Sequence, residues 1–363
     1  MSVPAPVVYI VEDLRTGGLE RVVQTLATTL DRTRFAPEVW CLARGGEIAD
    51  ALATAGTRVE ILDMGPRPSP RFLVALARRL RRVGARIVHC HGYTACTVGR
   101  TSATLARTPR VFAHIHTLGS WLTPRQRFIE RALSAFSTKV VCVSEAVREF
   151  VVECEGIPRR KTEVICNGVP APCLPDQASA RRSLGISGGI PVLGCVASLT
   201  PHKGHAILIE SVRLVRERMP DLVLLLVGDG PLRHELEHRA RDAGIQAVFA
   251  GRMENVGWAL AAMDAVALLS PEREGLSLAL IEALSASKPV IASRVGGTPE
   301  VIEDGVSGFL CEPGDASGAT RCIARVLEDP ARRRAMGEAG RQTFLKRFTA
   351  EAMTAQIERL YEQ

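Results

Sequence analysis

The clearest chemical signal in the chain is the stretch Ser270–Glu282, in which two carboxylates flank the start of a predicted helix. An apolar run ends at Leu269, a short turn follows, and a helical pattern begins near Ser277. The backbone N–H groups of Gly275, Leu276 and Ser277 would then be the unsatisfied donors at the helix N-terminus. Such donors, at the positive end of a helix dipole, are suited to binding a diphosphate.

Glu274 lies just before this helix and Glu282 lies inside it. A carboxylate next to a phosphate is unfavourable unless it accepts hydrogen bonds from ligand hydroxyls. Two carboxylates around a phosphate-binding helix start therefore predict a ligand with sugar hydroxyls on both sides of a diphosphate. The plainer alternative is a capping carboxylate at Glu274 and an exposed helix glutamate at Glu282.

Glycine-containing turns follow strands in both halves of the chain. Gly17 and Gly18 open the first predicted helix, and Gly228 begins the run Gly-Asp-Gly-Pro after a strand of the second half. Glycine lets backbone N–H groups approach an anion closely. The first turn is not the three-glycine dinucleotide motif, and a tight strand-to-helix turn is the alternative for it. In the second turn, the alternative is that Asp229 bonds its own backbone instead of a ligand.

Four histidines form two His-x-His pairs at predicted strand ends, His89 with His91 and His114 with His116. From the alternation of side chains along a strand, we expect His89 and His91 to face opposite sides, so that one of them is packed in the core. No acidic residue accompanies the pairs at the spacing of a zinc motif, so we predict no metal site.

Short β-branched runs alternate with longer helical patterns along the whole chain. The predicted strands are Val7–Val11, Glu38–Leu42, Val59–Leu62, Ile87–Cys90, Val111–Ile115, Val140–Val143, Glu163–Cys166, Val192–Val196, Val223–Val227, Val248–Ala250, Ala265–Leu269 and Val290–Ala292. The helical patterns include Glu20–Leu30, Ala178–Leu184, His205–Arg218, Leu232–Ala243, Val256–Ala262 and Ser277–Ala286. Nearly continuous apolar strands of this kind are typical of parallel sheets, so we predict an α/β fold with two Rossmann-like, doubly wound sheets.

The stretch 170–190 is rich in proline and glycine, has no long apolar run, and is predicted to link two domains. We expect an N-terminal domain over residues 1–169 and a C-terminal domain over residues 191–345. Residues 346–363 are predicted to form a helix that packs back toward the N-terminal domain. Ligands of such folds lie at the carboxyl ends of the strands, so we expect the two sheets to face each other across a ligand cleft.

Composition and charge limit the classes of protein to which this chain can belong. The 363 residues are 46% hydrophobic, with no run of about 20 uncharged apolar residues that could span a membrane. Residues 1–180 carry a net charge of +8 and the remainder −1. The basic half favours an anionic partner, with nucleic acid the weakest candidate because no nucleic-acid motif is present. The ten cysteines form no Cys-x-x-Cys motif and no secretory signal is recognised, which indicates a cytoplasmic protein.

The spacing of Glu274 and Glu282 resembles the paired-glutamate motif of the family-4 retaining glycosyltransferases, which have the GT-B fold. The resemblance covers essentially the whole chain, in the family's order. Other segments that resemble the family's motifs are Gly17–Arg21, His89–Gly92, His114–His116, Val143–Glu145, Asn167–Val169, Lys203–Gly204, Gly228–Pro231 and Gly296–Glu300. The resemblance implies an acceptor-binding N-terminal domain and a C-terminal domain that binds a nucleotide sugar.

The resemblance also implies roles for particular residues. His116, Lys203 and Glu274 would be catalytic, with His116 beside the reacting sugar, Lys203 at the diphosphate and Glu274 at the donor-sugar hydroxyls. The further donor-binding residues would be Gly17, Gly18, Ser198, Gly228, Gly251, Arg252, Met253, Gly275, Leu276, Ser277 and Glu282, of which Glu282 would hold the ribose. The acceptor-binding residues would be Glu20, His91, Tyr93 and Ser144.

The implied reaction moves a hexose-type sugar, with retention of anomeric configuration, from a UDP- or GDP-sugar to a lipid-linked or cell-envelope glycan acceptor. We expect no cofactor and no metal, because no Asp-x-Asp triplet occurs and Lys203 with the helix N–H groups supplies counter-charge. Two alternatives remain open. One is a nucleotide-sugar epimerase on the same fold, and the other is a non-catalytic subunit that binds a nucleotide sugar.

Two positions depart from the family pattern. Ser198 stands where the family commonly has an arginine of the diphosphate clamp, and His202 and Arg273 are the candidates to replace it. Ser287 precedes a Lys-Pro pair where the family usually has glycine. A serine costs little there unless the turn requires a positive φ.

The segment Pro70–Arg86 combines an apolar stripe with a cationic face. Its apolar residues at helical spacing are Phe72, Leu73, Leu76, Leu80 and Val83, and Arg71, Arg78, Arg82 and Arg86 fall largely opposite. One interpretation is a sheet-packing helix with a solvated cationic face. The other is peripheral, electrostatic docking of the N-terminal domain on the anionic inner face of the cell membrane, which agrees with the charge of that half.

Overall fold

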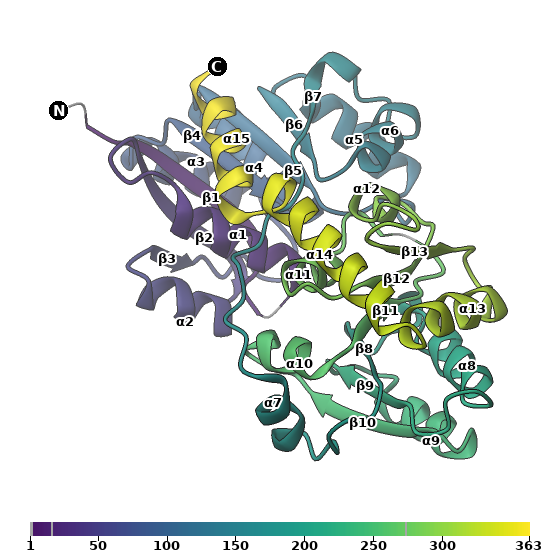
Figure 1. Ribbon diagram of the computed structural model, residues 1–363. Helices are drawn as coiled ribbons and strands as arrows, with labels where there is room; N and C mark the ends of the chain where they lie inside the picture. The colour runs from purple at the N-terminus through teal and green to yellow at the C-terminus, as the bar shows by residue number, and fades with distance from the viewer. Residues whose placement is uncertain (1–2, 16, 273) are drawn as a thin grey trace. The chain divides into compact units, whose positions relative to one another are not determined.

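The computed structural model describes residues 3–15, 17–272 and 274–363. Its contacts divide the chain into two compact units (Figure 1). Unit 1 comprises Met1–Pro170 and Ala350–Gln363, and unit 2 comprises Ala171–Thr349. Each unit contains one fully parallel sheet, so the two doubly wound α/β sheets predicted from the sequence are confirmed.

The sheet of unit 1 has seven strands in the order β3-β2-β1-β4-β5-β6-β7. They are β1 (Ala5–Asp13), β2 (Phe35–Arg44), β3 (Arg58–Ile61), β4 (Ile87–His91), β5 (Arg110–Ile115), β6 (Lys139–Cys142) and β7 (Thr162–Val164). The central strands are buried on both faces, as their nearly continuous apolar sequences predict.

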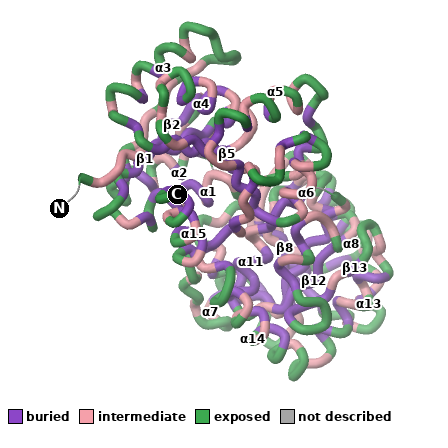
Figure 2. The backbone as a smooth tube through the Cα atoms, turned by 90° about the horizontal axis from the view of Figure 1, so that it is seen from above, coloured by how far each residue is buried: buried purple, intermediate pink, exposed green. Residues whose placement is uncertain are grey.

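The helices of unit 1 cover both faces of this sheet. They are α1 (Gly18–Thr29), α2 (Glu47–Thr54), α3 (Pro70–Arg82), α4 (Tyr93–Ala106), α5 (Pro124–Ser134), α6 (Glu145–Glu153) and α15 (Ala350–Glu362). Figure 2 shows α3, α4 and α5 on one side of the strands and α1 with α15 on the other. This division follows from right-handed crossovers between parallel strands.

The sheet of unit 2 has six strands in the order β10-β9-β8-β11-β12-β13. They are β8 (Val192–Val196), β9 (Val223–Val227), β10 (Gln246–Gly251), β11 (Ala265–Leu268), β12 (Val290–Ser293) and β13 (Gly308–Cys311). The helices are α7 (Gln177–Ser183), α8 (His205–Val215), α9 (Arg233–Asp242), α10 (Val256–Ala262), α11 (Leu278–Ser285), α12 (Thr298–Val301), α13 (Ala316–Leu327) and α14 (Pro330–Arg347).

The borders of the units differ in detail from the predicted ones. The stretch predicted as a linker, 170–190, lies in unit 2 from residue 171 on, because α7 packs against α10 there. The C-terminal helix, α15, groups with unit 1 from residue 350 rather than 346. It packs on α1, and Thr29 Oγ1 lies 2.5 Å from Thr354 Oγ1.

Helix α3 covers the predicted amphipathic segment but ends at Arg82, four residues earlier than the pattern indicated. Ser69 caps its N-terminus by accepting a hydrogen bond from the N–H of Phe72, and Gly84 follows its end at φ 63°. Leu76 and Leu80, on the inner face of α3, are buried. Among the described residues, no helix has the length and apolar character needed to cross a membrane.

Candidate functional site

The strongest candidate site of unit 2 lies after β11, where the chain turns into α11. Lys203 Nζ contacts Glu274 Oε1 at 2.7 Å, and the hydroxyl of Ser270 donates to the same oxygen at 2.6 Å. The Glu274 side chain is only 7% exposed. A carboxylate tolerates such burial because charge-assisted hydrogen bonds replace those it would make with water.

The turn that carries Lys203 depends on the glycine after it. Gly204 has φ 70° and is the N-cap of α8. A Cβ atom at this position would lie 1.8 Å from the carbonyl oxygen of Leu269, at the end of β11. Only glycine therefore allows the turn after β8 to approach β11 closely enough for Lys203 to reach Glu274.

The four residues that lead into α11, Glu274–Ser277, are all buried. Ser277 is the N-cap of this helix, and its side chain makes no capping hydrogen bond. Glu274, Gly275 and Leu276 lead into it. Glu282, inside α11, is 6% exposed, so the alternative that it is an exposed helix glutamate is wrong. The predicted diphosphate donors and both glutamates thus belong to one buried element of unit 2.

The turn at Gly228 has a packing role in the structure. A Cβ atom there would lie 2.0 Å from the carbonyl oxygen of Ala197, and Gly228 has φ 135°. The glycine lets the turn after β9 pack against the turn after β8. Gly251 ends β10, followed by the exposed Arg252 and the half-buried Met253. A donor-binding role for these residues remains a prediction.

Ser198 is exposed beside this site. Its hydroxyl lies 3.2 Å from Thr200 Oγ1, which in turn lies 3.5 Å from His202 Nε2. The position that the family commonly fills with arginine is thus surrounded by small polar groups. Arg273, the other candidate replacement, lies outside the described residues.

In unit 1, Gly17 is the N-cap of α1, which begins at Gly18. A Cβ atom at Gly17 would lie 2.1 Å from Glu20 Oε2, so the Glu20 side chain folds back over the start of the helix. Burial raises the pKa of Glu20. A carboxylate at a helix N-terminus is stabilised by the helix dipole. An anion that binds to these glycines must therefore displace or neutralise Glu20.

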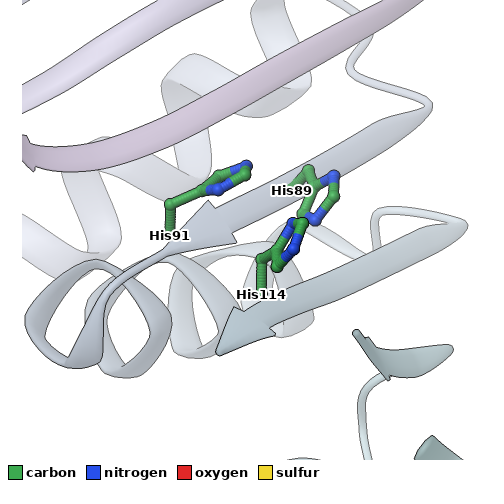
Figure 3. A group of neighbouring side chains, drawn as sticks. All are labelled: His89, His91 and His114. Atoms are coloured by element: carbon green, nitrogen blue, oxygen red, sulfur yellow. The ribbon is translucent and has the colours of Figure 1, made fainter. Parts of the chain in front are cut away.

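The prediction that His89 and His91 face opposite sides is wrong. Figure 3 shows His89, His91 and His114 grouped at the ends of β4 and β5. The ring centroids of His89 and His91 are 4.5 Å apart, and those of His114 and His116 are 4.4 Å apart. The physical reason is the two-residue period of a strand, which puts residues i and i+2 on the same face.

Hydrogen bonds hold three of the four histidine rings in place. His89 Nδ1 lies 2.6 Å from Tyr361 Oη, and the Tyr361 hydroxyl donates to Tyr9 at 3.3 Å. His91 Nδ1 lies 3.0 Å from His116 Nε2. Burial lowers the pKa of His89 and of His116 to about 3, so both imidazoles are neutral at pH 7. The histidines therefore form an uncharged polar cluster.

These histidines fit a metal ion poorly. The nearest ring nitrogens of His89, His91 and His114 all lie within 4.8 Å of one another. Tetrahedral zinc, with bonds of about 2.0–2.1 Å, needs nitrogens roughly 3.3 Å apart and directed at one point. The rings of His89 and His114 are instead stacked, with 10° between their planes. Metal binding would require the rings to rotate, and the absence of a metal stays a prediction.

Two other predicted acceptor residues occupy helix starts in unit 1. Tyr93 is the first residue of α4, and its ring meets Trp121 edge-on with 5.7 Å between centroids. Ser144 is buried at the N-cap of α6 and accepts a hydrogen bond from the N–H of Val147 at 3.2 Å. This capping role gives Ser144 a structural function, and its predicted contact with an acceptor remains a prediction.

Three side-chain contacts in the structure were not predicted. Ser270, the third member of the Lys203–Glu274 cluster, begins the quoted motif but carries no signal of its own. Tyr361 reaches His89 from a position 272 residues away in sequence. Arg100 and Glu130 form an almost completely buried ion pair between α4 and α5. Only spatial proximity, which local patterns do not give, reveals such partners.

Comparisons with known proteins agree with this architecture. Residues 16–171 match the family model described as Glycosyltransferase Family 4, and residues 176–343 match that of Glycosyl transferases group 1. A GDP-mannose-dependent alpha-(1-6)-phosphatidylinositol monomannoside mannosyltransferase of Mycolicibacterium smegmatis is 30% identical, with 95% of both chains covered. An N-acetyl-alpha-D-glucosaminyl L-malate synthase of Bacillus anthracis is 34% identical over 51% of this chain and about half (49%) of that relative.

Among solved structures, that of Anabaena Alr3699/HepE in complex with UDP-glucose is similar, with a TM-score of 0.88. The similarity covers 98% of this chain and 99% of that one at 23% identity, which supports the GT-B fold. The two matched halves coincide closely with units 1 and 2. The chain therefore belongs to the glycosyltransferases of family 4, group 1, and is a transferase with two parallel α/β units of the GT-B fold.

Proposed function

We propose that this enzyme moves a hexose-type sugar, with retention of configuration, from a UDP- or GDP-sugar to a lipid-linked or cell-envelope glycan acceptor without a metal ion. The observation that carries the proposal is the buried contact of 2.7 Å between Lys203 and Glu274 beside the start of α11. A cation suited to a diphosphate thus adjoins a carboxylate suited to hydroxyls. The ligand that satisfies both is a sugar joined to a diphosphate.

The chemistry follows from this arrangement. Cleavage of the bond between sugar and phosphate leaves an oxocarbenium-like sugar and a diphosphate with additional negative charge. Lys203 and the N–H groups at the start of α11 would stabilise that charge, and fixed donors of this kind give large rate effects. Glu274 would orient the donor sugar by accepting hydrogen bonds from its hydroxyls. We assign it no role as covalent nucleophile.

The acceptor is assigned to unit 1. Its neutral cluster, with His91 and His116 at the ends of β4 and β5, suits an uncharged hydroxyl group. A lipid-linked acceptor is supported by the name of the Mycolicibacterium relative, which acts on a phosphatidylinositol monomannoside. The exposed Arg71, Arg78 and Arg82 of α3 support peripheral attachment to the anionic inner face of the cell membrane.

Incubation with radiolabelled nucleotide sugars and a membrane extract tests the proposal. We expect label in the extracted lipid or glycan, formation of the same anomer as in the donor by NMR, and unchanged transfer after EDTA treatment. Malate serves as a contrasting soluble acceptor. Formation of an epimer instead would indicate the isomerase, and neither product would indicate a binding subunit. Loss of transfer with EDTA and its return with Mn²⁺ would contradict metal independence.

A further inference from the structure

The helices α3 and α4 and the first half of α5 lie in a stretch of sequence without acidic residues. Residues 64–129 contain twelve arginines and no aspartate or glutamate. The first acidic residue after this stretch, Glu130, is buried in α5 and paired with Arg100. The exposed surface of the layer α3–α4–α5 is therefore predominantly cationic, although Arg79 of α3 pairs with Glu60 of β3.

The same layer exposes aromatic side chains. Trp121, Phe128 and Phe136, on and beside α5, are 52%, 70% and 62% exposed. Phe128 and the exposed Arg125 lie on α5, Trp121 lies in the turn just before this helix, and Phe136 lies just after its end. Several large aromatic side chains exposed around one short helix supply apolar area of the kind found at binding surfaces.

The arginines of α3 and the aromatic residues of α5 belong to one side of unit 1. α3 packs against α4, and α4 packs against α5, so α4 lies between them. Figure 2 shows the exposed parts of α3 and α5 on the same side of the sheet. Two helix spacings of 8–10 Å put the axes of α3 and α5 about 20 Å apart. Both can therefore meet one broad, flat partner.

We propose that the exposed aromatic side chains on and beside α5, Trp121, Phe128 and Phe136, insert into the interface of an anionic lipid bilayer while α3 contacts the head groups. The proposal rests on the proposed membrane attachment of unit 1 and extends it. Attachment then has an apolar part that salt does not screen, in addition to the electrostatic part supplied by α3.

A lipid bilayer is favoured over a nucleic acid or a protein. Aromatic rings with an apolar body, flanked by arginine, are typical of segments that lie at the membrane interface. Residues 64–129 supply no acidic side chain to this region, and only Arg79 of the α3 arginines pairs with an acidic residue that the structure describes, Glu60. The excess of positive charge suits a uniformly anionic partner. No nucleic-acid motif is present in the sequence.

Quenching of tryptophan fluorescence by lipids brominated on their acyl chains tests the insertion directly. The chain has three tryptophans, of which Trp40 is buried and Trp258 lies in unit 2. We expect vesicles containing phosphatidylglycerol to quench the wild-type protein and the Trp258→Phe control, and to quench Trp121→Phe much less. Vesicle binding without quenching of Trp121 would overturn insertion and leave charge-only docking.

Sedimentation with the same vesicles separates the two contributions. In about 0.5 M salt, Phe128→Ala/Phe136→Ala should bind about 10-fold more weakly than the wild type. The matched control Val306→Ala/Leu345→Ala, which removes exposed apolar side chains from unit 2, should be unchanged. Arg78→Glu/Arg82→Glu should weaken binding mainly in low salt. Equal binding by the aromatic variant and its control would contradict the proposal.

Two further outcomes distinguish the proposals. Protection of Trp121 by single-stranded RNA, without binding to vesicles, would overturn the bilayer as partner. Stabilisation by nucleotide sugars, measured by thermal shift, should be the same in all these variants, because none lies in the donor site. Loss of vesicle binding with retained nucleotide-sugar binding would therefore refute membrane attachment and leave the proposed transfer reaction intact.

Discussion

The carboxyl ends of the two parallel sheets carry different chemistry. In unit 1 the strand ends gather four uncharged histidines, with His91 and His116 hydrogen-bonded to each other. In unit 2 the corresponding place holds the ion pair Lys203–Glu274 beside the start of α11. Similar architecture thus provides a neutral polar surface in one unit and a charged one in the other. The difference matches the proposed binding of a hydroxyl acceptor by unit 1 and an anionic donor by unit 2.

The largest expected effect is a loss of transfer rate when a charged side chain of the Lys203–Glu274 pair in unit 2 is removed. Lys203→Ala and Glu274→Ala should each lower the rate of transfer on the order of 100-fold, because each removes a group that acts on the developing charge or on the sugar. Initial rates with the cognate nucleotide sugar would measure this.

The exposed ion pair between Glu210 and Arg213 in α8 provides the matched control. Surface pairs contribute little, so Arg213→Ala should leave both rate and stability nearly unchanged. Near-normal turnover of either site variant, in protein that is folded by circular dichroism, would mean that the charged centre of unit 2 is not the donor site.

A second substitution adds positive charge to unit 2 and so increases its difference in charge from the neutral cluster of unit 1. Ser198→Arg should tighten binding of a nucleoside diphosphate about 10-fold, because a charge-assisted hydrogen bond contributes about 1.5 kcal/mol. Ser198 is exposed, so the longer side chain has room. Isothermal titration with UDP and GDP would measure the change, with Ser198→Ala as the control. Unchanged affinity would indicate that residue 198 does not face the phosphates.

The neutral cluster of unit 1 should appear in the pH dependence of stability. The folded pKa of His89 and of His116 is about 3, whereas an unfolded histidine titrates near 6.5. Between these values the unfolded chain binds protons that the folded chain does not, so the free energy of unfolding falls as the pH falls from 6.5 towards 3. Each such histidine contributes at most about 1.4 kcal/mol per pH unit.

Urea unfolding between pH 4.5 and 7 measures this slope. Burial also lowers the pKa of His114, so His114→Phe should make the slope shallower by up to one proton. The control is His234→Phe, at a side chain that is 93% exposed. Glu155, whose pKa burial raises to about 7, opposes the histidines with the opposite sign. An equal slope in the two variants would show that His114 is not buried as a neutral imidazole.

The smallest expected effect is a change in the free energy of unfolding on substitution of Ser287, which follows α11 in unit 2. Its φ of 55° shows that the turn does require a positive φ, so the serine that replaces the family's glycine is strained. Ser287→Gly should raise the free energy of unfolding by about 0.5–1 kcal/mol, after allowing for the greater freedom of glycine in the unfolded chain. Ala286→Gly, at φ −92°, should not stabilise the protein.

The pattern of apolar runs in the sequence was sufficient to predict the order of the helices and strands and the positions of most strands. β8 and β9 coincide with their predicted ranges because their residues are apolar and, except for the half-buried Val196, all buried. β13 was missed, since it has four residues and begins with Gly308, a poor strand former. α3 ended earlier than predicted because periodicity does not register the positive φ of Gly84.

For the site, local motifs located single residues but not their contacts. The sequence placed Glu274 and the start of α11 together because they are neighbours in the chain. The contact with Lys203 depends on β8 and β11 being adjacent, which is a property of the sheet order. The histidine orientation was predicted wrongly from a correct strand, because the two-residue period was misapplied.

The central claim is that the charged centre of unit 2 binds the sugar and diphosphate of a nucleotide sugar. A thermal-shift panel of UDP- and GDP-sugars tests it most directly, because a bound ligand stabilises the fold by RT ln(1 + [L]/Kd). We predict that at least one nucleotide sugar raises the Tm more than its nucleoside diphosphate does, and that Glu274→Ala abolishes this additional increment. No stabilisation by any nucleotide sugar, or an equal increment in wild type and variant, would contradict the claim.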